Sequence, residues 1–108
     1  MEEYRIVLES QLGPRSGTLR FEMRDGGVTG LITLLGHENP AFGRCTGTDS
    51  LCLSHHLHTA VSDLACVSEL KLVGKKICGT LYCDRYHMKL HGEKIMKNAE
   101  GGEELAGN

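Results

Sequence analysis

Apolar and polar residues alternate with a period of two along much of the chain. The clearest case is the segment 16–24, in which Leu19, Phe21 and Met23 alternate with charged residues. Successive side chains of a β-strand point to opposite faces, so this pattern predicts a strand with one buried and one solvated face. An Asp-Gly-Gly motif at 25–27 favours the positive φ angles of a tight hairpin directly after it.

Similar segments recur at intervals of roughly 10 to 12 residues, the cadence of a small antiparallel fold. The segment 28–35 is apolar on both faces, which predicts a central position in the sheet. Residues 13–17 and 36–40 contain Gly and Pro and are predicted to be turns or loops. The other predicted strands are 4–9, 41–48, 51–60, 77–83 and 86–91.

The segment 62–72 is compatible with either a strand or a short helix. A strand would place four apolar side chains on one side: Leu64, Cys66, Leu70 and Leu72. A helix would begin with Ser62 as its capping residue. We favour the strand because Val67 and Val73 are β-branched. The fold class is therefore all-β: a meander-like antiparallel barrel or sandwich of seven to eight strands, with a short helix possible near 62–72.

The length of 108 residues is typical of one domain, which we place at residues 1–92. Residues 93–108 lose the alternation, and we expect them to form a polar, disordered C-terminal tail. Within 1–92, ten Lys and Arg balance ten Asp and Glu. This neutral body has no basic run, which argues against a nucleic-acid partner because such binding depends on displaced counterions.

The N-terminus has no basic start followed by an apolar run, and no apolar stretch approaches the roughly 18 residues of a membrane span. We therefore expect no signal peptide, no membrane partner and a cytoplasmic location. The five cysteines are an odd number without an export signal. They are predicted to be free thiols that pack as small apolar side chains.

The sequence SHHLHTA, residues 54–60, places three histidines within four positions. On a strand, His55 interrupts the apolar row, whereas His56 and His58 share the opposite face about 6.5–7 Å apart. Two imidazoles at this spacing can ligate one metal ion, with His87 or His91 completing the site from another strand. The alternative interpretation, a row of solvent-facing polar side chains, is the one we favour. We accordingly expect no cofactor, with zinc on these four histidines as the alternative.

Other reactive residues do not form a recognisable catalytic pattern. The spacing Cys78-x4-Cys83-x3-His87-x3-His91 leaves a gap too short for a zinc finger. Cys52 shares a face with His56 and His58, but nothing in the sequence brings it close to either one. Phosphate-binding loops and nucleophile-elbow motifs are absent. We assign no catalytic residue and do not expect an enzyme.

The function predicted from these observations is a non-enzymatic binding or assembly module. The apolar surface exceeds what one open sheet can cover, so either the sheet closes on itself or a second subunit covers it. We expect a homo-oligomer, with a dimer favoured. One alternative is the metal-binding protein described above. Another is a barrel that binds a small apolar ligand, of unknown identity, in its interior.

Overall fold

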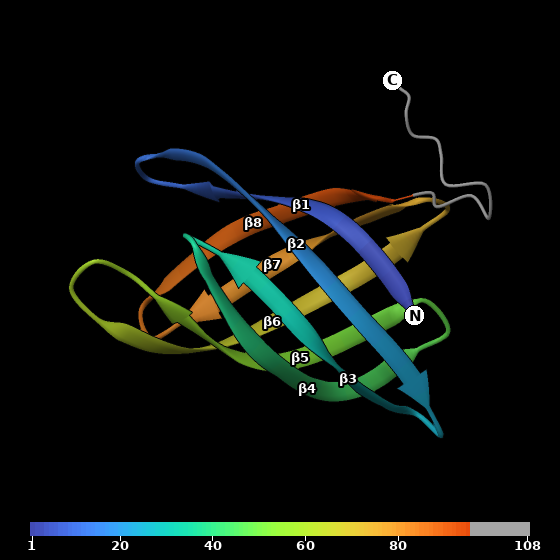
Figure 1. The fold of residues 1–108 in the computed structure, drawn as a ribbon. Coiled ribbons are helices and arrows are strands. Elements are labelled where there is room, and N and C mark those ends of the chain that lie inside the picture. The colour runs from blue at the N-terminus through green and yellow to red at the C-terminus, as the bar shows by residue number, and fades with distance from the viewer. Residues whose placement is uncertain (96–108) are drawn as a thin grey trace.

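Residues 1–95, which the computed structural model describes, form eight antiparallel strands without a helix among them (Figure 1). Each strand pairs with the next, and residues 4–8 of the first pair with residues 90–94 of the last, so the sheet closes into a barrel. The predicted all-β antiparallel barrel is confirmed. The strands are β1 (Glu2–Ser10), β2 (Gly13–Arg24), β3 (Gly27–Leu34), β4 (His37–Gly47), β5 (Ser50–His58), β6 (Asp63–Val73), β7 (Lys76–Cys83) and β8 (Tyr86–Lys94).

Residues 62–72, for which the sequence allowed a strand or a short helix, belong mostly to the strand β6. The possible helix near 62–72 is therefore wrong. Its residues alternate between a buried and an exposed face, with Cys66, Ser68 and Leu70 buried. The segments 13–17 and 36–40, predicted as turns or loops, largely belong to β2 and β4. None of the described residues forms a helix that is long and apolar enough to cross a membrane.

The end of the barrel sheet lies slightly beyond the predicted domain boundary at residue 92. β8 continues to Lys94, and the amide nitrogen of Ile95 donates a hydrogen bond to the carbonyl oxygen of Glu3 at 2.8 Å. The rest of the predicted tail, residues 96–108, lies outside the described residues.

Closure of the barrel changes the argument for self-association. All eight strands have a hydrogen-bonded neighbour on both sides, because β1 and β8 pair with each other. The open edges that favoured a dimer are therefore satisfied within one chain. A homo-oligomer stays a prediction, now without that support.

At five inward-facing glycines, the backbone of a neighbouring strand lies too close to leave room for a Cβ atom. At Gly43 in β4, an added Cβ would lie 1.7 Å from the carbonyl oxygen of Cys52 in β5. Glycines at such points let neighbouring strands coil tightly enough to close a small barrel. The glycines with this type of conflict are Gly17, Gly30, Gly43, Gly79 and Gly92.

The barrel interior is packed with aliphatic side chains along most of its length. At the end that holds the β2–β3, β4–β5 and β6–β7 turns, Tyr4 and Phe21 are buried and stack with ring centroids 5.9 Å apart. On the same inner face, Lys94 Nζ forms an ion pair with Glu2 Oε1 at 2.5 Å. The carboxylate of Glu2 raises the pKa of Lys94 by accepting this hydrogen bond. The charges of Lys94 and Glu2 therefore neutralise each other.

Candidate ligand-binding site

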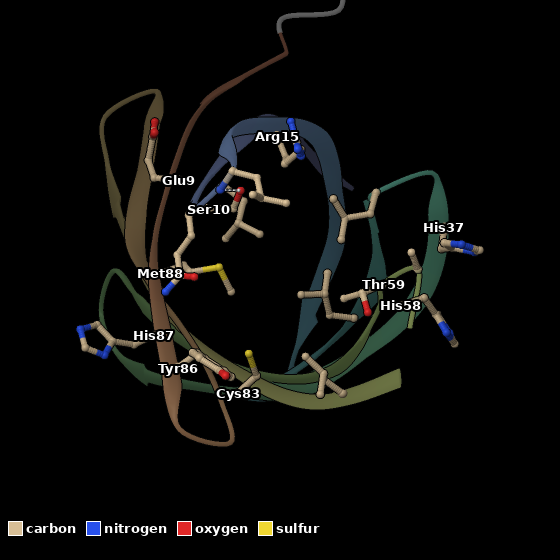
Figure 2. A pocket seen from close by; sticks show the side chains of 17 residues that line it. Glu9, Ser10, Arg15, His37, His58, Thr59, Cys83, Tyr86, His87 and Met88 are labelled. Carbon is tan, nitrogen blue, oxygen red and sulfur yellow. Dashed lines mark hydrogen bonds between the residues drawn. The ribbon is translucent and has the colours of Figure 1, made fainter. Parts of the chain in front are cut away.

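A cavity of about 720 Å³ lies at the opposite end of the barrel (Figure 2). Four hairpins surround it: β1–β2, β3–β4, β5–β6 and β7–β8. Its size falls within the range of roughly 300–1,000 Å³ that is typical of small-molecule sites. Seven of the lining side chains are aliphatic or thioether groups: Leu8, Leu12, Leu35, Leu57, Ala60, Leu64 and Met88.

The acidic and imidazole side chains around the cavity do not face its centre. In Figure 2, the side chains of Glu9, His37, His58 and His87 point away from the centre of the cavity. Met88 and Cys83 point into it in the same view. The space enclosed by the four hairpins is therefore mainly apolar.

Two hydroxyl groups of the lining are used by the hairpins themselves. Ser10 Oγ donates a hydrogen bond to the carbonyl oxygen of Gly13 at 2.6 Å, within the β1–β2 turn. Thr59 Oγ1 donates to the carbonyl oxygen of Ser62 at 3.1 Å, within the β5–β6 loop. These bonds stabilise the β1–β2 turn and the β5–β6 loop. Arg15 is the only Lys or Arg among the described residues of the lining.

Leu35 lines the cavity from an unusual backbone conformation. It has φ of +55° and precedes Gly36, whose φ is +80°, in the turn between β3 and β4. Left-handed conformations suit Gly, Asn and Asp but cost most other residues about 1–2 kcal/mol. The Asp25–Gly26 turn at the other end has the same signs of φ and carries the residues that such turns favour.

Below the cavity, the barrel interior contains a buried pair of polar side chains. His55 is 4% exposed and Ser68 is fully buried. His55 Nδ1 lies 3.2 Å from the carbonyl oxygen of His56, and Nε2 lies 2.7 Å from Ser68 Oγ. Because a carbonyl only accepts hydrogen bonds, the proton resides on Nδ1 and the Ser68 hydroxyl donates to Nε2. Burial lowers the pKa of His55, which keeps the ring neutral.

This His–Ser pair is structural. Neither side chain lines the cavity, and the hydroxyl of Ser68 has no exposed surface from which to attack a substrate. His55 was recognisable in the sequence as an interruption of an apolar row. Ser68 interrupts the inward row of β6 in the same way, and this signal could have identified it as the partner of a buried histidine.

The two histidines of β5 predicted to share a face do so on the outside of the barrel. His56 Nδ1 lies 3.0 Å from Asp63 Oδ1, and His58 Nδ1 lies 3.6 Å from the same oxygen. All three side chains are substantially exposed. Asp63 is the first residue of β6 and lies directly opposite His58 in the strand register.

The other two predicted ligands, His87 and His91, lie on β8, which β6 and β7 separate from β5. His91 Nε2 lies 2.7 Å from Glu9 Oε2, and the ring of His87 packs near Tyr82 with centroids 6.2 Å apart. The structure therefore does not bring the four histidines together. Within residues 1–95 there is no group of three or more His, Cys, Asp or Glu residues that could hold a metal ion.

Two cysteines face each other inside the barrel. Cys66 and Cys83 are buried at directly opposite positions of β6 and β7, and no disulfide links them in this structure. Burial, followed by the neighbouring Cys83 thiol, raises the pKa of Cys66 to about 12. Burial and a raised pKa are typical of a thiol that packs in the interior rather than of an activated nucleophile.

The site is thus an apolar cavity at one end of a barrel, with a single guanidinium on its wall. Outward-facing histidines surround it, and an inert His–Ser pair lies beneath it. Comparison of the chain with protein-family models, with curated proteins and with solved structures gave no match.

Proposed function

We propose that this protein binds a small, mainly apolar molecule in the cavity at the β1–β2, β3–β4, β5–β6 and β7–β8 end of the barrel. The observation that carries the proposal is the cavity itself: about 720 Å³ with a predominantly aliphatic lining. Burying an aliphatic ligand there removes apolar surface from water on both sides, worth roughly 25 cal/mol per Å².

The architecture supports this proposal. An eight-stranded barrel is just wide enough either to be filled by side chains or to hold one small ligand. Here the end with Tyr4 and Phe21 is packed, whereas the opposite end encloses open space. The closed sheet also surrounds the cavity with hydrogen-bonded strands.

Binding is favoured over catalysis and over metal binding by the directions of the polar side chains. The acidic and imidazole groups near the rim point away from the cavity, so they are poorly placed to act on a molecule inside it. The histidines considered as metal ligands lie on the outer surface of two strands that are not neighbours. Fold alone would not support this choice, because one barrel architecture serves many functions.

Leu35 provides a second line of support. Its turn would be more favourable with Asn or Gly at this position, yet it carries a leucine whose side chain lines the cavity. Strained residues often persist where they serve a site. The unfavourable φ is explained if the leucine is needed for contact with an apolar ligand.

The test is a fluorescence titration with N-phenylnaphthylamine, an uncharged apolar probe. We expect saturable binding with one site per chain. Replacing Leu35 with Asn should weaken binding about fivefold, through loss of about 1 kcal/mol of apolar contact. The free energy of unfolding of this variant should stay within about 1 kcal/mol of that of the unmutated protein, because relief of the left-handed backbone strain offsets the lost packing.

The matched control is Asp25→Asn, in the equivalent turn at the other end of the barrel. It should alter neither probe binding nor stability beyond about 0.5 kcal/mol, as for an exposed site. Absence of saturable probe binding to the unmutated protein would refute the proposed function. Equal losses of affinity in both variants would place the binding site elsewhere.

A further inference from the structure

Arg15 occupies an inward-facing position at the wall of the cavity. In the register of β1 and β2 it lies directly opposite Leu8, which is buried inside the barrel. Residues directly opposite one another on paired strands share a face of the sheet, so Arg15 belongs to the inner face. It is half-buried and lies beside the β1–β2 hairpin at the rim (Figure 2). Among the described residues that line the cavity, it is the only Lys or Arg.

Within the part of the chain that the structure describes, no acidic side chain forms an ion pair with this guanidinium. Glu9 is the acidic residue of the lining, but its carboxylate lies on the outer face and contacts His91. At the packed end, by contrast, the inward-facing Lys94 and Glu2 form an ion pair. The inward-facing cation at the packed end thus has a carboxylate partner, whereas Arg15 at the cavity end has no ion-pair partner among the described residues.

We infer that the ligand of the cavity is an amphipathic anion, with an aliphatic body among the leucines and an oxyanion head group on Arg15. This inference rests on the proposed function and specifies the class of ligand. Guanidinium groups bind carboxylates and phosphates through two parallel hydrogen bonds, and the interaction strengthens where water is partly excluded. A cationic ligand would be repelled by the same side chain.

The body of the ligand follows from the lining. Tyr86 is the only Phe, Tyr or Trp among the described residues of the cavity wall, so the contacts that the wall offers are mainly aliphatic. Leucines and Met88 provide flexible aliphatic contacts. A short alkyl chain with a carboxylate or phosphate head combines both requirements.

The test is displacement of N-phenylnaphthylamine by four decyl compounds at about pH 8. The compounds are decanoate, decyl phosphate, decanol and decylamine. We expect the anions to displace the probe at concentrations about tenfold lower than decylamine. Arg15→Gln should weaken the anions about tenfold and leave decanol within about twofold. Arg24→Gln, the same change of charge on the exposed opposite end of β2, should alter none of them.

The outcomes separate this inference from the proposed function. If the probe does not bind at all, the proposed function fails. If the probe binds but Arg15→Gln leaves the anions unaffected, the anionic head group is wrong while the apolar site stands. An effect confined to decanoate or to decyl phosphate supports the inference and identifies the head group. Should Arg15→Gln fail to fold, equal displacement by decanoate and decylamine from the unmutated protein would overturn the inference.

Discussion

Replacing Gly43 with alanine is expected to prevent the barrel from folding. The new methyl group would lie 1.7 Å from the carbonyl oxygen of Cys52 and 2.9 Å from the Cα of Leu53. Both atoms belong to the backbone of β5, so no side-chain rotation can relieve the conflict, and the two strands must separate. Overpacking that side chains can absorb already costs about 1–3 kcal/mol. We therefore expect a loss of more than about 3 kcal/mol, a large fraction of the stability of a domain this small.

The control is Gly47→Ala, in the same strand. A Cβ at Gly47 meets nothing closer than Ser50 Oγ at 3.7 Å, and its φ is not positive. Its unfolding free energy should change by less than about 1 kcal/mol. Urea unfolding followed by circular dichroism measures both variants. Cooperative unfolding of Gly43→Ala at the original midpoint would show that the barrel does not require this close strand contact.

Stability should also fall as the pH drops below about 6.5, because His55 is buried as the neutral ring. Its pKa in the folded protein lies below the unfolded value of 6.5. Between these two values the unfolded chain binds a proton that the folded chain does not, so the free energy of unfolding decreases as the pH falls. The decrease due to one such group approaches about 1.4 kcal/mol per pH unit.

Two variants test whether this pH dependence of stability comes from His55 and Ser68 rather than from other residues. Ser68→Ala leaves His55 Nε2 buried without its donor and should cost about 1–3 kcal/mol at neutral pH. The double variant His55→Leu with Ser68→Ala removes both polar groups, so it should be more stable than Ser68→Ala alone. It should also lose the His55 component of the pH dependence. Urea unfolding at several pH values between about 5 and 8 measures these differences, and an unchanged slope in the double variant would contradict the assignment.

The strands of this protein are predictable because one face of most of them is apolar and the other polar. The alternation around Leu19 and Phe21 and the Asp25–Gly26 turn both appear in the structure as the sequence indicates. In β6 the pattern is less clear, because Ser68 is polar yet faces inward. Its identity as a strand depends on pairing with β5 and β7, which local sequence does not encode.

Barrel closure and the cavity are harder to read from the sequence. Closure depends on which backbone atoms lie next to residues such as Gly43 and Gly79, and these contacts form only after strands pair. The cavity is lined by Leu57 and Met88, which the sequence does not distinguish from leucines in the packed core. Arg15 was missed because its segment, with Gly and Pro, was predicted to be a loop. Its inward position follows only from the register of β1 and β2.

Leucine-methyl NMR spectra, recorded during a titration with decanol, test the proposed ligand site most directly. Leucines are distributed along the whole barrel, so one labelling scheme reports on both ends. We predict that methyl shifts of Leu35, Leu57 and Leu64 change with decanol concentration until saturation. Those of Leu51 and Leu70, near the β4–β5 and β6–β7 turns, should stay constant. Shifts confined to Leu51 and Leu70, or no saturable shifts at all, would contradict a binding site in the cavity.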